Sequence, residues 1–232
     1  MNRSLGLIGA GAALMLASGA LADSVSYAFN TGTTNFTTAI SNFQTTGSMM
    51  DGMKLTAYFG DGSNEQATWG DDAVSGPDAG RAVGTNWQVR ENGDTFGGAW
   101  EIQNRTGKSL TKLTIDAGVG DTVFDIDFGG MEGTTGSALG LDFDITDTGT
   151  GLNILATYSD RIALTGNNPV GDLWRFLQLE FLNNGGLASG STLFWTQDTD
   201  NLKFSGDLGV PLPTAAGMGL TSLVLCGLRR RR

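Results

Sequence analysis

Carboxylate side chains are the main chemically active groups in this sequence. The chain has 24 Asp and Glu residues, one Cys and no His. The lack of His excludes Ser-His-Asp and Cys-His nucleophiles and imidazole metal ligands, and a single Cys excludes a Cys-rich zinc site. The chemistry that remains is the binding of hard cations by oxygen ligands, or acid–base catalysis by paired carboxylates.

Asp-x-Asp pairs are the clearest arrangement of such groups. Side chains of a strand alternate between its two faces, so both carboxylates of a pair lie on one face. Three pairs occur, at Asp125/Asp127, Asp142/Asp144 and Asp198/Asp200. In the first two, Asp fills successive polar positions of an alternating strand, and we predict that they only mark a solvated face. The third pair lies at a strand end beside turn residues, and we predict a structural Ca²⁺ site at Asp198 and Asp200 and no other cofactor.

Aromatic residues and carboxylates leave two further functions open. The alternative to a non-catalytic protein is a glycan-binding module, with or without calcium, in which Trp69 and Trp87 stack on sugars. These two residues flank a stretch rich in Gly and Asp, residues 70–84, that we expect to be an exposed loop. Large aromatic residues on strands more often belong to the core. A glycoside hydrolase is the third interpretation, but none of the five Glu residues forms a closely spaced acid pair on one strand.

The elements that must position these residues are predicted to be short strands. Gly accounts for 36 of 232 residues and only 16% are charged, which is typical of strands joined by tight turns. Apolar and polar residues alternate with a period of two, as at Leu113, Ile115 and Ala117. Strands with one dry face need a second layer to cover it. We therefore predict an all-β fold, an antiparallel, jelly-roll-like β-sandwich formed by one domain over residues 23–209.

The charge of this domain is strongly acidic. Without Arg3 and the four arginines at the C-terminus, nine basic residues remain against all 24 acidic residues, which gives a net charge of −15. Such a surface repels phosphate backbones. Nucleic acid is therefore not an expected partner.

The N-terminus has the pattern of a secretory signal peptide. A basic residue, Arg3, precedes an apolar run over residues 5–16, and the small residues of Ala20-Leu21-Ala22 follow. We predict that residues 1–22 are a signal peptide removed by signal peptidase, so that the mature chain begins at Asp23. The rest of the chain is then exported.

The C-terminus has a second apolar segment with a basic end. The motif Val210-Pro211-Leu212-Pro213 is followed by an uncharged run over residues 214–228 and by four arginines, Arg229, Arg230, Arg231 and Arg232. The run is short for a membrane span, which needs about 20 residues. We nevertheless predict a single membrane helix, with the arginines held on the cytoplasmic side.

This tail resembles the PEP-CTERM family of sorting signals, in the variant known as VPLPA-CTERM. In that resemblance Val210, Pro211, Leu212 and Pro213 correspond to the recognition signature and the four arginines to the stop. Thr214 stands where the pattern has Ala. The resemblance therefore defines the recognition motif more closely than the position of cleavage. The resemblance implies an exosortase-type membrane transpeptidase of Gram-negative bacteria as partner. It also implies a precursor anchored in the inner membrane and delivery to the cell surface or extracellular matrix, often alongside exopolysaccharide.

The middle of the chain is similar to a recurring ectodomain of proteins with such tails. The similar pieces extend from Gly47 to Asp200 and include Gly60-Asp61-Gly62-Ser63, Gly93-Asp94-Thr95-Phe96 and Asp198-Thr199-Asp200. That ectodomain implies no established enzymatic activity. We therefore expect an exported, non-catalytic surface or matrix protein rather than an enzyme.

Overall fold

The computed structural model describes residues 23–42, 44–127, 133–137, 139–146 and 151–203. The predicted signal peptide, the sorting motif, the membrane helix and the terminal arginines all lie outside these residues. Within them the chain is all-β, with no α-helix and two short 3₁₀ turns, η1 (Gly47–Met49) and η2 (Gly118–Gly120). No helix of this part of the chain is long and apolar enough to span a membrane.

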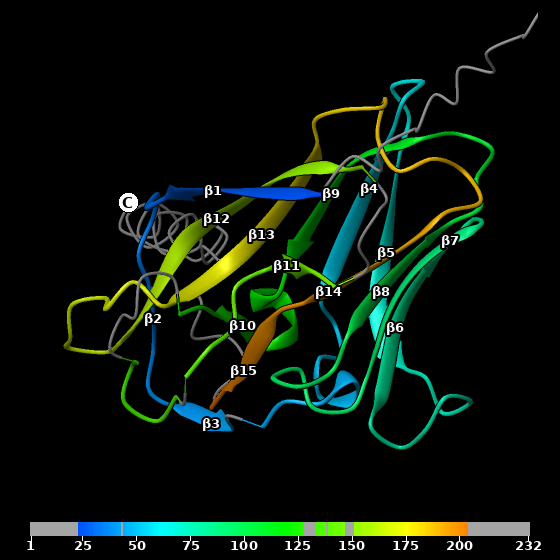
Figure 1. Cartoon of the computed structure of the whole chain (residues 1–232). Helices are drawn as coiled ribbons and strands as arrows, with labels where there is room; N and C mark the ends of the chain where they lie inside the picture. Colours follow the sequence, from blue (N-terminus) through cyan, green and yellow to red (C-terminus); the bar gives the residue numbers. More distant parts are fainter. Residues whose placement is uncertain (1–22, 43, 128–132, 138, 147–150, 204–232) are drawn as a thin grey trace, which may run out of the picture.

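The strands form a curled and mostly antiparallel sheet (Figure 1). They are β1 (Ser24–Asn30), β2 (Asn35–Thr37), β3 (Ile40–Asn42), β4 (Lys54–Phe59), β5 (Asn64–Asp71), β6 (Ala79–Gly84), β7 (Trp87–Asn92), β8 (Trp100–Asn104), β9 (Leu110–Asp116), β10 (Thr122–Asp125), β11 (Asp144–Ile145), β12 (Asn153–Leu164), β13 (Leu173–Phe181), β14 (Thr192–Thr196) and β15 (Asp198–Leu202). Their order in the sheet is β11-β14-β8-β7-β6-β5-β4-β9-β13-β10-β15-β3.

The long strand β12 lies on the other edge of β13 and carries the N-terminal strands. β1 and β2 both pair with β12 in parallel, over different parts of its length. Between them Asp160 has a φ of +56° and accepts a hydrogen bond from the N–H of Thr33 at 3.2 Å. All other strand pairs are antiparallel, as predicted from the sequence.

Alternating side chains explain why the sheet curls around a core. In β4, Leu55, Ala57 and Phe59 are buried and the residues between them are not. The buried faces of strands far apart in the order belong to one cluster of apolar side chains. Burial of such a face stabilises the fold by roughly 25 cal/mol per Å² of apolar surface.

Aromatic rings of β5, β8 and β14 meet in this core. The ring centroids of Trp69 and Trp100 are 5.2 Å apart, and those of Trp100 and Trp195 are 5.8 Å apart. Phe143 continues the series at 5.9 Å from Trp195. The indole N–H of Trp100 donates to the carbonyl of Gln197 at 2.8 Å, whereas that of Trp195 is buried without a hydrogen-bond partner. This packing fixes β5, β8 and β14 against one another.

The prediction of a long loop over residues 70–84 is wrong in extent, because the loop is shorter than predicted. β5 continues to Asp71 and β6 begins at Ala79, so only residues 72–78 connect them. Gly80 lies in β6 because a side chain has no room there: a Cβ at this position would be 2.0 Å from the carbonyl oxygen of Gly47. The glycines of this stretch therefore serve close backbone packing as well as turns.

Candidate metal centre

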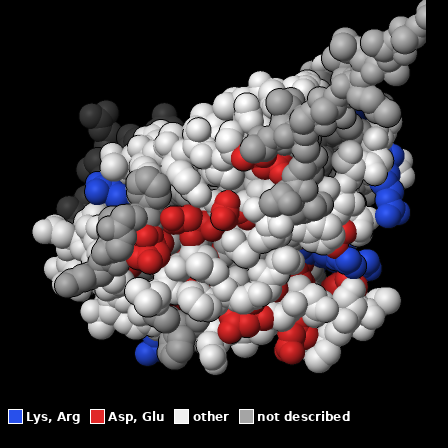
Figure 2. Space-filling model, viewed as in Figure 1, with Lys and Arg blue, Asp and Glu red and all other residues white. Residues whose placement is uncertain are grey.

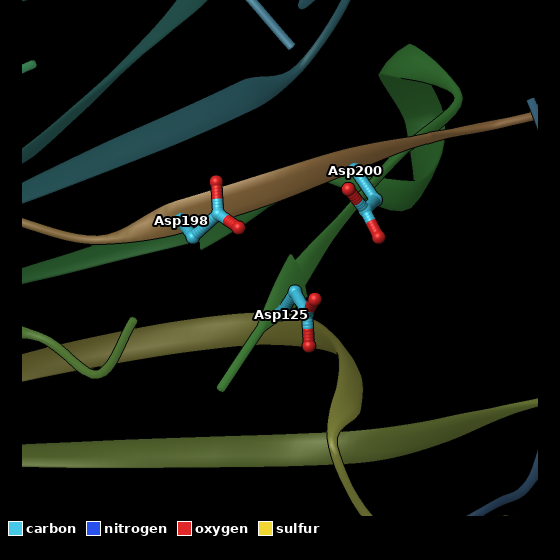
Figure 3. Close-up of side chains that lie close together, drawn as sticks. All are labelled: Asp125, Asp198 and Asp200. Carbon is cyan, nitrogen blue, oxygen red and sulfur yellow. The ribbon is translucent and has the colours of Figure 1, made fainter. Parts of the chain in front are cut away.

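Three aspartates from two neighbouring strands form the most concentrated group of carboxylates in the described residues. β10 and β15 run antiparallel, with Asp125 directly opposite Asp198 and Val123 opposite Asp200. Because residues two apart share a face, Asp200 lies diagonally across from Asp125. Figure 3 shows the three side chains close together, Asp198 and Asp200 on β15 and Asp125 on β10. We refer to Asp125, Asp198 and Asp200 as the aspartate cluster.

The spacing of the carboxylates suits a single bound cation. One oxygen from each side chain lies within 4.8 Å of the oxygens of the other two. Calcium binds oxygens at about 2.3–2.6 Å, so two oxygens on opposite sides of one ion are at most about 5 Å apart. The cluster therefore needs no rearrangement of its strands to bring three ligands onto one ion.

The cluster is almost completely removed from solvent. The exposed fraction is 1% for Asp125, 1% for Asp198 and zero for Asp200. Asp125 Oδ1 and Asp200 Oδ1 are buried and have no hydrogen-bond partner. An unpaired buried carboxylate costs several kcal/mol, so polar atoms of this kind normally have a partner. The two oxygens are therefore available to a ligand that enters the cluster.

Burial and mutual repulsion raise the pKa values of all three side chains. Loss of solvation is the largest cause for each, and it raises the pKa of Asp125 to about 8, of Asp198 to about 7 and of Asp200 to about 6. The charge of Asp200 adds to the effect on the other two, and Asp172 adds to it for Asp125 and Asp200. None of the ion pairs of the described residues includes a member of the cluster. A bound cation would supply the missing positive charge.

Neighbouring hydroxyl groups hold the outer oxygens in place. Thr95 donates a hydrogen bond to Asp198 Oδ1 at 2.9 Å, from the loop between β7 and β8. Ser137 Oγ contacts both Asp125 Oδ2, at 2.5 Å, and Asp200 Oδ2. These contacts leave the two Oδ1 atoms of Asp125 and Asp200 free, and Ser137 places a further oxygen beside the cluster.

A fourth buried acid, Asp172, lies next to the cluster at the start of β13. It is 1% exposed, and the residue after it, Leu173, pairs with Asp125. Asp172 Oδ1 accepts a hydrogen bond from the hydroxyl of Thr134 at 2.8 Å, and Oδ2 accepts one from the backbone N–H of the same residue. Asp172 thus anchors the segment 133–137, which carries Ser137, against the cluster.

The structure brings together some of the carboxylates singled out in the sequence and separates others. Asp198 and Asp200, the predicted calcium ligands, do lie together. The prediction that Asp125 faces solvent is wrong, because Ser137 and the carboxylates of Asp198 and Asp200 lie against its side chain on this face of β10. Asp144 is exposed and Asp142 is half-buried, and neither is part of the cluster. Asp172 was not singled out in the sequence, which has no second acid within two residues to mark it.

The proposed sugar-stacking residues do not form a platform. Trp69 is 2% exposed and Trp87 is 3% exposed. The indole N–H of Trp69 donates to the carbonyl of Gly47 at 2.7 Å, and that of Trp87 to Glu65 Oε2 at 2.9 Å. Their expected exposure is wrong because the stretch between them forms strands that pack both rings inward. Glycan binding through these two rings therefore loses its basis.

Comparisons of the chain with models of protein families, with curated proteins and with solved structures gave no significant match in any of the three.

Proposed function

We propose that this chain is an exported, non-catalytic surface or matrix protein whose β-rich domain is completed by a Ca²⁺ ion bound to the aspartate cluster. The observation that carries the calcium proposal is the pair of buried, unpartnered oxygens, Asp125 Oδ1 and Asp200 Oδ1. Three nearly solvent-free carboxylates without a basic partner are unfavourable unless they are protonated or bind a cation.

Calcium fits the cluster better than magnesium. Ca²⁺ accepts six to eight oxygens in flexible geometry and tolerates ligands from irregular positions, whereas Mg²⁺ requires a near-ideal octahedron and usually retains several waters. The side chains of the cluster are 0–1% exposed, which leaves little room for a hydrated ion. Ser137 supplies a nearby oxygen for a larger coordination number. Acidic side chains on the face shown in Figure 2 would also favour the approach of a cation.

We further propose that the curled sheet is a β-sandwich. One apolar cluster joins the inner faces of strands from β14, near one end of the strand order, to β10, near the other. In a sandwich, two such faces pack about 10 Å apart with side chains interdigitating between them. The tilted contact of Trp69 with Trp100 and the stacked contact of Trp100 with Trp195 fit this arrangement. A jelly-roll topology is the specific form that we propose.

Export and sorting are the parts of the proposal that depend on the two ends of the sequence. The resemblance of residues 210–232 to a VPLPA-CTERM tail supports recognition by an exosortase-type transpeptidase, after removal of residues 1–22 by signal peptidase. The protein would then pass from an inner-membrane precursor to the cell surface, in association with exopolysaccharide. Mass spectrometry of the protein recovered from cells tests this directly. A mature chain that begins at Asp23 and ends within or just after the motif at 210–213 supports sorting, and an intact chain of residues 1–232 contradicts it.

Thermal unfolding in calcium and in a chelator tests the metal centre. The protein should melt at a higher temperature in Ca²⁺, with a gain of about 2.7 kcal/mol in unfolding free energy at 100 times the dissociation constant. Asp198→Asn should abolish this gain. In the chelator at pH 8 the same variant should be at least as stable as the wild type, because it removes a buried charge. Equal gains in calcium for the two proteins would contradict the proposal.

A further inference from the structure

A hollow lies on the outer face of the sheet, where β6, β7 and β8 meet the turn between β6 and β7. It has a volume of about 180 Å³, and its lining includes Val83 of β6, Asn86 in the turn, Gln88 of β7, Gln103 of β8 and Arg105 just after β8. We refer to it as the outer hollow. None of its lining residues belongs to the aspartate cluster.

Strand pairing puts the side chains of this wall on one face of the sheet. Gln88 is paired with Val83 on one side and with Gln103 on the other. Side chains of paired residues lie next to each other, so these three form a row across β6, β7 and β8. The neighbours of Gln88 in β7, Trp87 and Val89, are buried in the core. The row therefore faces away from the core.

Arg105 borders this row and has no acidic partner. It is exposed, and its backbone N–H donates to the carbonyl of Asn86 at 2.7 Å. None of the ion pairs within the described residues includes Arg105, whereas Arg81, Arg90 and Arg175 each pair with an Asp or Glu. No Asp or Glu of the described part of the chain lines the hollow. An anionic group that enters would therefore meet a guanidinium and no carboxylate in the wall.

Amide and apolar groups form the rest of the wall. The side chains of Asn86, Gln88 and Gln103 each offer amide donors and an acceptor oxygen. Gln103 donates from its amide to Glu101 Oε1, and its own oxygen remains an acceptor. Val83 is 54% exposed and adds an apolar surface. Amides that bind hydroxyl groups, beside a small apolar surface that contacts C–H groups, match the chemistry of a sugar ring.

The size and the charge of the hollow define the ligand further. Its volume is below the roughly 300–1,000 Å³ of pockets for drug-sized ligands, so about one ring fits. Residues 23–209 have a net charge of −15, which repels anions, but 0.15 M salt screens exposed charges beyond about 8 Å. Direct contact with Arg105 is affected much less. The groups of the wall therefore decide the choice, and they favour a ring that carries both hydroxyl groups and a carboxylate.

We propose that the outer hollow binds one uronic acid residue of an acidic glycan. The Arg105 guanidinium pairs with the carboxylate, the amides of Gln88 and Gln103 bind hydroxyl groups, and Val83 packs against the C–H face of the ring. A simple organic acid shares the carboxylate, but it would leave the amides unused. The site goes beyond the proposed function, because it depends on neither calcium nor sorting.

Matched ligands test the proposal in saturation-transfer NMR titrations at pH 7 and 0.15 M salt, with a chelator present. The ligands are the methyl glycosides of glucuronic and galacturonic acid, the methyl glycosides of glucose and galactose, and acetate. At least one uronide should bind about tenfold or more tightly than its neutral counterpart and than acetate, because hydrogen bonds to charged groups are the stronger ones. The chelator prevents a carboxylate from binding to the aspartate cluster through Ca²⁺.

Three variants locate the binding. Arg105→Gln removes the guanidinium and should lower the affinity for the uronide to about that for the neutral glycoside. Lys112→Gln, on β9 and outside the hollow, removes the same charge and should bind as the wild type does. Gln88→Ala should weaken the binding of the uronide and the neutral glycoside alike. Arg105 and Gln88 are not buried, so these variants should fold, which their melting temperatures check.

Each contrary result overturns the proposal. These results are no binding of either uronide by the wild type, equal affinities for a uronide and its neutral counterpart, and unchanged binding in Arg105→Gln. Acetate that binds as tightly as the uronide would show that the sugar ring contributes nothing. An equal loss in Lys112→Gln and Arg105→Gln would show a general effect of charge and no site at Arg105.

Discussion

The aspartate cluster should give the metal-free protein a pH dependence opposite to that of paired surface carboxylates. The perturbation is a rise in pH from 5 to 8 in the presence of a chelator. The folded-state pKa values of Asp200, Asp198 and Asp125 are raised from 3.8 to about 6, 7 and 8. Over this range the folded protein holds protons that the unfolded chain has already released. Stability is therefore greatest near the acid end and falls as pH rises.

The size of the fall follows from the number of protons held. One such proton corresponds to about 1.4 kcal/mol of unfolding free energy per pH unit. The three protons held at pH 5 give an upper limit of about 4 kcal/mol for the loss of unfolding free energy per pH unit. This slope declines to about 1.4 kcal/mol per pH unit above pH 7, as Asp200 and then Asp198 ionise. Burial also raises the pKa of Glu91 to about 8, so ionisation of Glu91 lowers the unfolding free energy further as pH rises.

Urea unfolding at pH 5, 6, 7 and 8, in chelator and in calcium, measures this effect. We expect a clear loss of unfolding free energy between pH 5 and 8 in chelator and a much smaller loss in calcium, because the ion neutralises the cluster but leaves Glu91 unaffected. Asp198→Asn should reduce the loss in chelator. A metal-free protein whose stability is constant or rises between pH 5 and 8 would refute the reasoning.

Three further predictions concern the core and the surface. Trp100→Ala should destabilise the protein by about 3–5 kcal/mol in urea unfolding, because the ring is fully buried between two other indoles; a loss below about 1 kcal/mol would contradict the packing. Gly80→Ala should lower the melting temperature by several degrees, since the added Cβ would lie 2.0 Å from the carbonyl oxygen of Gly47, whereas Gly70→Ala, with nothing within 4 Å of the Cβ, is its control and should differ little from the wild type. Lys108→Ala removes an exposed ion pair with Asp61, a hydrogen bond to Ser63 Oγ and a contact with the Phe59 ring and should change unfolding free energy by about 1 kcal/mol or less; a larger loss would show a structural role for this residue.

The strand content of the fold could be predicted from the sequence because alternation is a local property. Leu113 and Ile115 are buried in β9, as their spacing indicates. Asn184, Gly185 and Gly186 all have positive φ, which their residue types allow at turns. These features depend only on neighbours in the chain.

The positions of tight turns are harder to predict from local composition. Asn92-Gly93 has the composition of a two-residue hairpin turn, but residues 93–99 form a longer connection between β7 and β8. A two-residue turn occurs instead at Thr85-Asn86, where Asn86 has a φ of +63°. Asp94 pairs with Thr46 across this connection, and such a contact between distant segments cannot be inferred from local composition.

The metal centre could be predicted only in part for a related reason. Asp198 and Asp200 are neighbours in the sequence, and their spacing marks them. Asp125 and Asp172 join them through the pairing of β10 with β15 and of β10 with β13. The alternation of apolar and polar residues is the same whether the polar face of a strand is exposed to water or covered by another part of the chain. The sequence alone therefore does not show which Asp-x-Asp residues become buried.

Calorimetric titration of Ca²⁺ into the metal-free protein at pH 7 tests the central claim most directly. The wild type should bind one equivalent with release of protons, Asp125→Asn should show no binding at that site, and Asp144→Asn, which removes an exposed aspartate, should bind as the wild type does. Absence of any binding heat together with an unchanged melting temperature, or equal binding by all three proteins, would contradict a calcium site at Asp125, Asp198 and Asp200.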